Sequence, residues 1–475
     1  MLFNSVEFVI FYILVTTLYF LLPYAFRWVL LLAASCYFYM AFVPIYILIL
    51  GFTIVIDYFA GIYIEKAQNK RKRKLLLTAS LVANIGILAV FKYFNFINLN
   101  LTFLFEKFNY HNPIPYLAIL LPIGLSFHTF QAMSYTIEVY RGNQKAEKHF
   151  GIYSLYVMFY PQLVAGPIER PQNILHQMHT KHPFNYDLMV SGLKLMLWGF
   201  FKKLVIADRL SLYVNSVFNN PELHNGTSIA IAAFFFAIQI YCDFSGYSDI
   251  AIGCAKTMGF DLMKNFNRPY FATNIQDFWR RWHISLSTWF RDYLYIPLGG
   301  SKTSTARRYL NLFIIFLVSG LWHGANYTYI IWGALHGFYS VVYIIIKPYL
   351  RKTPQNEFAA RVMRIGNIAI TITLVTFAWI FFRANSVTDA FTIIGNLKSF
   401  GAKPFMGDGI SNFAHSVLAI LILFMVEYKM EYLPQKFNFF TSHNIAVRWG
   451  SIAITIFLLL ILGVFNGGQF IYFQF

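Results

Sequence analysis

The chain has 475 residues, of which 58% are hydrophobic, 20% aromatic and only 12% charged. A water-soluble protein of this length needs more polar side chains to cover its surface, so the composition excludes a soluble globular enzyme. The formal net charge of +18 does not indicate nucleic-acid binding. The basic residues gather in short segments beside apolar runs, which is typical of the cytoplasmic loops of membrane proteins.

Several apolar runs approach or exceed the roughly 20 residues that cross a bilayer. They predict an all-α polytopic membrane protein with about eleven or twelve transmembrane or re-entrant helices. The expected spans include Val6–Phe26, Trp28–Val43, Ile45–Ile64, Leu75–Ile97, Tyr116–Glu138 and Trp449–Phe465. The first run has no basic segment before it and no small-residue cleavage site after it, so we expect it to be retained as a span.

Charge next to the first spans predicts their orientation. No Lys or Arg precedes the first span, whereas Glu65–Lys74 is the densest basic stretch in the chain and Arg141–His149 is again basic. The positive-inside rule places both basic stretches, expected to be loops, in the cytoplasm and the N-terminus outside.

The middle of the chain differs from its flanks in the length and continuity of its apolar runs. Its apolar runs are short, and Tyr160–Gln172 contains three prolines and a Glu-Arg pair. Irregular backbone at membrane depth is tolerated only where protein or a water-filled cavity surrounds it. We therefore expect a single domain, 1–475, with a central catalytic region at 150–345 between peripheral helices at 1–140 and 360–475. No internal repeat is evident, which argues against an inverted-repeat transporter.

The segment Asp277–Gly300 concentrates charge and three tryptophans within 24 residues. On a single helix, its aromatic side chains fall on one face, and Arg280, Arg281 and Arg291 fall on the other. His283 lies at the boundary, one turn before Ser287. The tryptophans are expected to anchor the helix at the membrane interface, and lipid headgroups are an alternative partner for Arg280 and Arg281.

The segment Val318–Tyr339 places His323 and His336 in neutral apolar sequence, each flanked by glycines at a four-residue step. Such glycines allow two helices to approach closely or leave room for a substrate. The two histidines are 13 residues apart, about 220° around a helix, so they can share a site only if the helix breaks. His323, beside Trp322 and close to Asn326, is the functional candidate. His336 and His128 are expected to be packing residues.

A third segment, Gln239–Gly253, carries Asp243 and Asp249 inside apolar sequence. Such carboxylates can act in proton relays, but we expect them to be structural and to pair with Arg281 or Arg291. The chain has no GxSxG elbow, P-loop, HExxH or GxGxxG motif. Its three cysteines, Cys36, Cys242 and Cys254, have neither disulfide-framework nor zinc-site spacing.

These segments together resemble the bacterial membrane-bound O-acyltransferases, in particular the branch similar to alginate O-acetyltransferases. The residues that carry the resemblance are "DFWRRWHISLSTWFRDYLYIPLGG", "GLWHGANYTYIIWGALHG", "DFSGYSDIAIG", "LPIGLSFHTFQAMSY", "LVAGPIERP" and "FAWIFFRAN". They extend over nearly the whole chain, and the combination of FWRRWH with WHG is highly specific.

The resemblance implies a ring of peripheral helices around a thin central region, with funnels from both sides that meet near a histidine. The family's histidine and its upstream polar residue match His323 and His283, which are 323 − 283 = 40 residues apart. His323 would act as general base, and His283 would polarise the carbonyl, orient the acceptor or hold the coenzyme. The residues expected to support them or contact substrate are Trp322, Asn326, Arg281, Asp243, Asp249, Ser287 and Arg291.

The implied reaction is transfer of an acetyl group from cytoplasmic acetyl-CoA to an extracytoplasmic polysaccharide, such as alginate, cellulose or peptidoglycan, with the help of a partner protein. The implied location is the bacterial inner membrane, with lipids as neighbours and with no metal or permanently bound cofactor. Two alternatives are D-alanyl transfer to teichoic acid and a polysaccharide or lipid transporter that works without CoA. The length and the DFSGYSD segment favour acetyl transfer over D-alanyl transfer.

Overall fold

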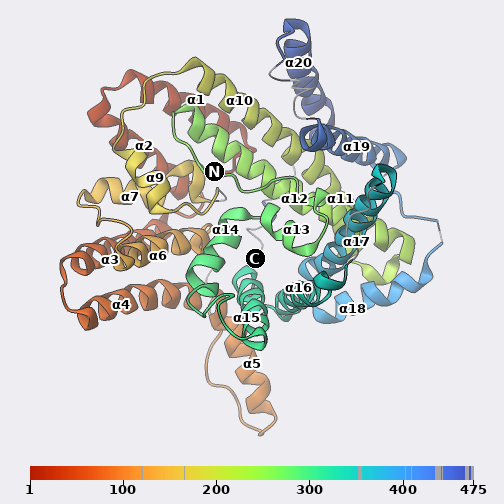
Figure 1. The fold of residues 1–475 in the computed structure, drawn as a ribbon, viewed down its shortest axis with the longest axis horizontal. Helices are drawn as coiled ribbons and strands as arrows, with labels where there is room; N and C mark the ends of the chain where they lie inside the picture. The colour runs from red at the N-terminus through yellow and green to blue at the C-terminus, as the bar shows by residue number, and fades with distance from the viewer. Residues whose placement is uncertain are drawn as a thin grey trace. The chain divides into compact units, whose positions relative to one another are not determined.

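The computed structural model describes residues 1–475 except 119–120, 165, 351–355, 402, 408, 434–439, 441, 466–469 and 472–475. Within the described residues, every regular element is a helix (Figure 1). Two expected features include residues outside this part of the chain, namely the span from Tyr116 (119–120) and the broken segment at Tyr160–Gln172 (165). The all-α prediction is confirmed.

Seven helical stretches in the described residues are long and apolar enough to cross a membrane: Pro44–Lys66, Lys70–Glu106, Gly226–Thr257, Tyr327–Tyr349, Glu357–Arg383, Ile410–Tyr432 and Ile445–Leu462. Two shorter apolar helices, Val6–Leu21 and Tyr24–Met40, precede them. The protein is therefore a multi-pass membrane protein, as its apolar runs predict.

The chain forms two compact units. The first comprises Met1–Met196 and Asp249–Met263, and the second comprises Leu197–Ser248 and Lys264–Phe475. The long helix α12 (Gly226–Thr257) contributes residues to both.

The helices that begin in the first unit are α1 (Val6–Leu21), α2 (Tyr24–Met40), α3 (Ile47–Lys66), α4 (Lys70–Leu88), α5 (Phe94–Glu106), α6 (Leu125–Arg141), α7 (Phe150–Met158), α8 (Tyr160–Leu163), α9 (Pro171–Met178) and α10 (Tyr186–Phe200). Helices α3, α4 and α6 pack side by side (Figure 1). Their interface buries Asp57, whose carboxylate accepts hydrogen bonds from Ser80 Oγ at 2.5 Å and Asn84 Nδ2 at 2.9 Å. Burial of this acid is tolerated because those donors replace water.

Two boundaries in the first unit differ from the expected ones. Helix α6 begins at Leu125 and not at Tyr116, because Pro122 lacks an N–H donor and Gly124 adopts the left-handed φ of +76°. The basic stretch Glu65–Lys74 is not a loop. Only Ala67–Asn69 connects α3 to α4, and the following lysines and arginines form the first turn of α4.

The helices that begin in the second unit are α11 (Asp208–Phe218), α12, α13 (Ile275–Arg281), α14 (Ile284–Phe290), α15 (Thr305–His323), α16 (Tyr327–Ile346), α17 (Glu357–Arg383), α18 (Val387–Asn396), α19 (Ile410–Tyr432) and α20 (Ile445–Leu462). In the part of the chain that the structure describes, three short segments are π-helical: Ala89–Tyr93, Phe201–Ala207 and Arg291–Tyr295. Such segments are rare and are often found at functional sites.

Helices α15 and α16 form a closely packed hairpin that positions the site (Figure 1). A Cβ atom at Gly320 would lie 2.3 Å from the carbonyl oxygen of Tyr329, and a Cβ atom at Gly333 would lie 2.3 Å from that of Phe316. Both glycines therefore allow the two backbones to touch, which confirms the close approach expected from their spacing.

Replacing Gly333 by alanine should force α15 and α16 apart, because its Cβ would meet backbone that cannot move aside. Overpacking of this kind costs about 1–3 kcal/mol. We expect a lower melting temperature for purified Gly333→Ala. Gly366→Ala, where the added Cβ meets nothing within 4 Å, is the matched control. Equal melting temperatures for the two variants would contradict this view of the hairpin.

Candidate active site

The segment that was expected to form one helix is broken at its histidine. Helix α13 ends at Arg281, Trp282 is extended, and His283 has the left-handed φ of +41° before α14 begins. The single-helix prediction is therefore wrong. A left-handed backbone is uncommon and costly for a residue with a Cβ, and it persists only where neighbouring structure enforces it.

The neighbouring structure is a short stretch around Asn265. The carbonyl oxygen of Asn265 accepts the Ile284 N–H at 2.8 Å, and the Asn267 N–H donates to the Arg281 carbonyl at 2.9 Å. These two backbone hydrogen bonds lie on either side of His283 and stabilise the non-helical backbone between α13 and α14. Sequence analysis did not identify Asn265, because it lies 18 residues from His283.

The side chain of Asn265 also fixes the imidazole of His283. Its Oδ1 lies 3.1 Å from His283 Nδ1, 2.9 Å from Ser285 Oγ and 3.3 Å from the Ser285 N–H. The Ser285 N–H can only donate, so the amide atom is an oxygen, and we assign the ring proton of His283 to Nδ1, which faces that oxygen. The amide nitrogen of Asn265 donates to Ser248 Oγ at 3.1 Å.

The lone pair of His283 therefore lies on Nε2. Burial lowers the pKa of His283 to about 3, because an apolar environment disfavours the charged ring. The rings of Phe244 and Phe266 lie 4.6 Å and 6.2 Å from the imidazole, measured between centroids. His283 is thus a neutral, oriented hydrogen-bond acceptor near neutral pH.

His323 is the last residue of α15. The helical conformation ends at Gly324, and the next helix, α16, begins at Tyr327. The sequence predicted that His323 and His336 could share a site only if the helix between them is broken. The structure contains such a break. The C-terminal end of a helix carries partial negative charge. That end would stabilise the imidazolium that forms when His323 accepts a proton.

Aromatic rings enclose His323, which is 4% exposed. The ring centroids of Trp322, Trp332 and Phe382 lie 4.9, 5.0 and 5.3 Å from its own, all at steep angles. Because these rings exclude water, the imidazole sits in surroundings that strengthen interactions with a bound reactant.

Trp322 connects the two candidate histidines. Its ring contacts His323 at 4.9 Å and His283 at 6.3 Å, measured between centroids. The structure therefore brings His283, Trp322 and His323 together within the second unit. Two buried imidazoles beside one buried indole can bind a hydroxyl group and accept its proton.

His336 lies behind this group. It is fully buried, and its centroid is 5.0 Å from that of Trp332 and 4.9 Å from that of Trp279. Neither ring nitrogen has a hydrogen-bond partner among the described residues. These surroundings are those of a packing residue.

His336→Phe should therefore retain most of the wild-type activity, because phenylalanine preserves the ring contacts. We would measure acyl transfer per mole of folded protein in membranes. Loss of activity in a variant that accumulates normally would place His336 in the reaction.

The tryptophan face of the charged segment is buried inside the protein. Trp282 is 1% exposed and Trp289 is 6% exposed, and the Trp282 ring packs 5.1 Å from that of Trp379. The expectation that these tryptophans anchor the helix at the membrane interface is wrong. At the break, Trp282 packs on Trp379 of α17, and α13 also contacts that helix.

The expected pairing of the central carboxylates and arginines is also wrong. Arg281 pairs with Asp277 at 3.1 Å and with Glu431 at 2.9 Å, and Arg291 pairs with its neighbour Asp292 at 2.7 Å. Arg281 thereby ties α13 to α19, and Arg268 reaches the same Glu431 at 2.6 Å.

Asp243 pairs with Lys203, which the sequence analysis did not select. Lys203 Nζ lies 2.7 Å from Asp243 Oδ1 and 2.8 Å from Asp208 Oδ1, and all three side chains are at most 4% exposed. The second Asp243 oxygen accepts the backbone N–H of Ile471 at 2.7 Å. The signal was present in the sequence, because Lys202 and Lys203 interrupt an apolar run, and such residues are costly within a membrane.

The remaining predicted residues hold the backbone near the histidines. Ser287 Oγ donates to the Trp282 carbonyl at 3.1 Å across the break. Asn326 caps α16 by accepting the Thr328 N–H at 3.1 Å, and its amide nitrogen donates to the Asn385 carbonyl at 3.3 Å. Asp249 is half-buried on α12 and belongs to the first unit.

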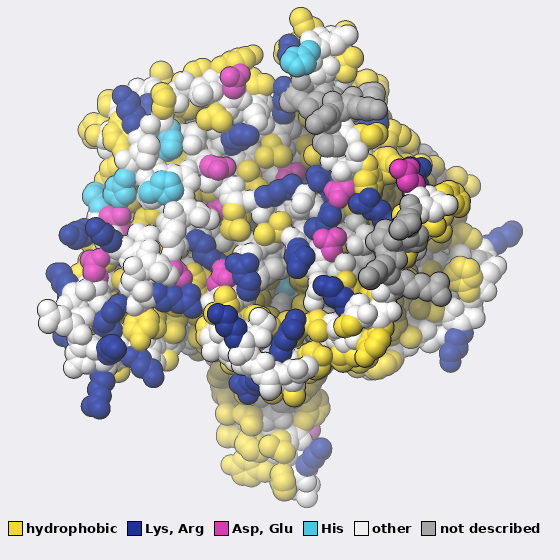
Figure 2. Space-filling view, in the orientation of Figure 1, with side chains coloured by type: hydrophobic (Ala, Val, Ile, Leu, Met, Phe, Trp, Pro, Cys, Tyr) yellow, Lys and Arg dark blue, Asp and Glu magenta, His cyan; other side chains and the backbone are white. Residues whose placement is uncertain are grey.

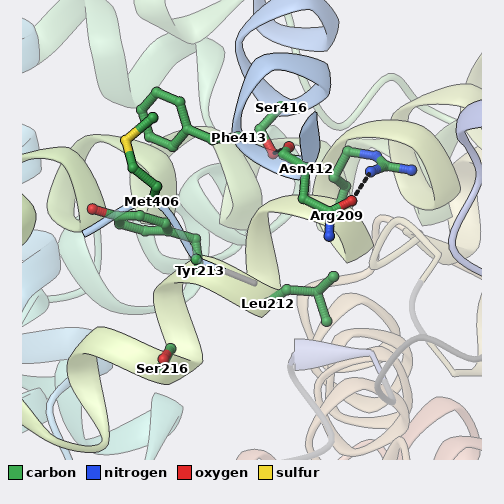
Figure 3. Close-up of a pocket in the computed structure, with 9 residues that line it drawn as sticks. Arg209, Leu212, Tyr213, Ser216, Met406, Asn412, Phe413 and Ser416 are labelled. Carbon is green, nitrogen blue, oxygen red and sulfur yellow. Dashed lines mark hydrogen bonds between the residues drawn. The ribbon is translucent and has the colours of Figure 1, made fainter. Parts of the chain in front are cut away.

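A cavity between α11 and α19 is a separate feature of the second unit (Figure 3). Arg209 donates to Asn412 there at 3.3 Å, as the dashed line shows, and to the Leu462 carbonyl at 3.1 Å. The cavity offers only about 20 Å³ to solvent. That space suits a single water molecule, so this cavity is not a substrate site.

The family model described as the membrane-bound O-acyltransferase family matches residues 149–387. The match includes His283, His323 and the whole α15–α16 hairpin. The chain belongs to the membrane-bound O-acyltransferase family. Membership confirms the resemblance found in the sequence, and the protein is an O-acyltransferase of the membrane.

Curated relatives of this membrane-bound O-acyltransferase carry more specific names. It is 39% identical to the probable alginate O-acetylase AlgI of Pseudomonas aeruginosa, over 81% of this chain and 72% of the relative. It is 34% identical to the peptidoglycan O-acetyltransferase of Helicobacter pylori, over 77% and 72%. It is 29% identical to the teichoic acid D-alanyltransferase of Bacillus subtilis, over 57% and 69%.

Proposed function

We propose that this O-acyltransferase takes an acetyl group from cytoplasmic acetyl-CoA and passes it across the membrane for O-acetylation of an extracytoplasmic polysaccharide. A partner protein completes the transfer outside. The main support is the pair of buried histidines on Trp322, inside the region that matches the family. Similarity to O-acetylating relatives covers more of the chain than similarity to the D-alanyltransferase, 81% against 57%.

In this proposal His323 accepts the proton of the attacking hydroxyl group. The oxygen then bonds to the thioester carbonyl carbon, the carbon–sulfur bond breaks, and the proton passes from His323 to the leaving thiolate, which departs as free CoA. A neutral imidazole suits both steps because it can accept and return a proton near neutral pH. No step requires a metal ion.

His283 has a different part, which its tautomer restricts. Its Nδ1–H is held by Asn265, so Nε2 presents a lone pair and cannot donate to a carbonyl oxygen. We therefore do not assign polarisation of the carbonyl to the neutral ring of His283. We assign it the orientation of a donor group, either the hydroxyl of the acceptor or an amide N–H of the coenzyme.

Acetyl transfer is tested with purified protein in vesicles. Acetyl-CoA labelled in its acetyl group should lose the label to the acceptor fraction only when the protein is present, whereas D-alanine on a carrier protein should not be used. Preferential use of the D-alanyl donor would move the function to the class of the Bacillus subtilis relative. Release of polysaccharide across the vesicle without any acyl donor would instead make the protein a transporter.

The direction of transfer requires the Ala67–Asn69 connection to lie in the cytoplasm. Gln68 is exposed within that short connection, so Gln68→Cys should resist a membrane-impermeant thiol reagent added to intact cells and react after the membrane is opened. The native cysteines are two buried residues and the half-buried Cys36, and their wild-type background is subtracted. Labelling of the introduced thiol in intact cells would reverse the assigned orientation.

A further inference from the structure

The first unit contains a cavity of about 290 Å³ that the acyl-transfer site does not use. It lies between the α1–α2 turn, the start of α7 and the end of α9. Its inner wall is apolar, and Leu31, Leu155 and Phe260 there are at most 3% exposed. Its rim is polar and consists of Tyr24, Arg27, His149, His179 and Thr180.

Arg27 is the fixed cation of this rim. Its Nε donates to the Leu22 carbonyl at 3.2 Å, and one Nη donates to the His182 carbonyl at 2.7 Å. Its guanidinium lies 4.8 Å above the ring of Tyr19. No carboxylate of a described residue forms an ion pair with it. A guanidinium has five N–H donors, so these two carbonyls leave donors for a ligand.

A second donor at the rim is His149. Its Nδ1 accepts the Ile152 N–H at 3.1 Å, which leaves the ring proton on Nε2. The ring packs 4.8 Å from that of Trp28. The nearby acid, Glu147, is already engaged, because its carboxylate lies 2.7 Å from His179 Nε2.

The surface around the rim adds further positive charge. Lys148 and Lys181, the chain neighbours of the rim residues His149 and Thr180, are exposed, and histidine side chains gather over α7 and α9 (Figure 2). The rim and its surroundings therefore attract an anion, whereas the inner wall requires an apolar group. A soluble phosphate would satisfy only the rim.

We propose that this cavity binds an anionic phospholipid. The headgroup phosphate binds Arg27, and the part of an acyl chain next to the glycerol packs against the apolar wall. Arginine forms bidentate hydrogen bonds with phosphate, and basic pockets between helices on the cytoplasmic side suit anionic headgroups. The rim belongs to the side that the positive-inside rule assigns to the cytoplasm. This inference does not depend on the proposed acetyl transfer.

Native mass spectrometry of the purified protein tests the site with two lipids of equal chain length, dioleoylphosphatidylglycerol and dioleoylphosphatidylcholine. Wild-type protein should retain the anionic lipid preferentially. Arg27→Gln should weaken its retention about fivefold or more, the effect of one basic residue at an anionic surface. Arg71→Gln, an exposed arginine at the start of α4, should leave it unchanged.

A second pair of variants separates binding from folding, because Arg27 also holds backbone carbonyls. Thr180 is exposed at the rim, so Thr180→Glu should repel the headgroup while Thr180→Gln should not. Equal retention in Thr180→Glu and Thr180→Gln, or equal retention of the zwitterionic lipid by the wild type, would overturn the proposal. Displacement of the lipid by glycerol phosphate at the same concentration would show a site for soluble phosphate and would also overturn it.

Discussion

His323→Ala should abolish measurable O-acetylation in cells while the protein accumulates at the wild-type level. The variant removes the side chain that we assign as proton acceptor, and such groups contribute about 10²–10⁴-fold to the rate. Folding should survive, because His323 is the last residue of α15 and its ring packs on the larger rings of Trp322, Trp332 and Phe382. The measurement is the acetyl content of the extracellular polymer, with the protein level in membranes as reference.

His323→Phe supplies the matched control for packing, because it restores an aromatic ring without a basic nitrogen. It should be as inactive as His323→Ala and at least as stable. Substantial activity in His323→Phe would show that the ring only fills space, and the general base would have to be sought elsewhere.

Lys203→Met should have the largest effect on stability. Lys203 lies between Asp243 and Asp208 in a buried group with two acids and one base. Removing the ammonium leaves two carboxylates close together without a cation, and breaking a buried ion pair costs about 3–5 kcal/mol. We expect a marked fall in the amount of folded protein, measured by fluorescence-detected size-exclusion chromatography.

Asp243→Asn is the informative comparison for Lys203→Met. It leaves one acid and one base in the buried group, and the amide oxygen can still accept the Ile471 N–H that the carboxylate accepts now. Its loss of stability should therefore be smaller than that of Lys203→Met. The opposite order would contradict the view that Lys203 is the cation that offsets both buried carboxylates.

Much of the fold could be predicted because bilayer burial leaves a local record in the sequence. The spans at Ile45–Ile64 and Trp449–Phe465 correspond to α3 and α20 within a few residues. The glycines of the α15–α16 hairpin were identified from their spacing alone. These features depend on length, polarity and residue size, all of which can be recognised within one segment.

The break at His283 could not be predicted in that way. No proline or glycine marks it, and its cause is the hydrogen bonding of Asn265, which is distant in the sequence. The end of α15 differs, because Gly324 and the helix cap Asn326 were visible between His323 and Tyr327. In Val318–Tyr339, Gly324 and Asn326 are residues that commonly end and begin helices, but the apolar composition around them suggested one continuous helix.

The ion pairs were the least predictable part of the site. Arg281 pairs with Glu431, which is 150 residues away in the sequence, and Asp243 of α12 pairs with Lys203 of the preceding π-helical segment. Sequence proximity suggested that the central acids and arginines would neutralise one another. The fold satisfies each charge with a partner that only the tertiary structure brings close.

The most direct test of the account is single-turnover release of CoA from acetyl-CoA by purified protein in nanodiscs, with acceptor present, for wild type, His323→Gln and His283→Gln. Glutamine retains hydrogen bonding but cannot accept a proton near neutral pH. We expect His323→Gln to slow CoA release by about 10²-fold or more. We expect His283→Gln mainly to raise the acceptor or donor concentration needed for half-maximal rate. A wild-type rate in His323→Gln, with release lost in His283→Gln, would contradict the account and assign the base to His283.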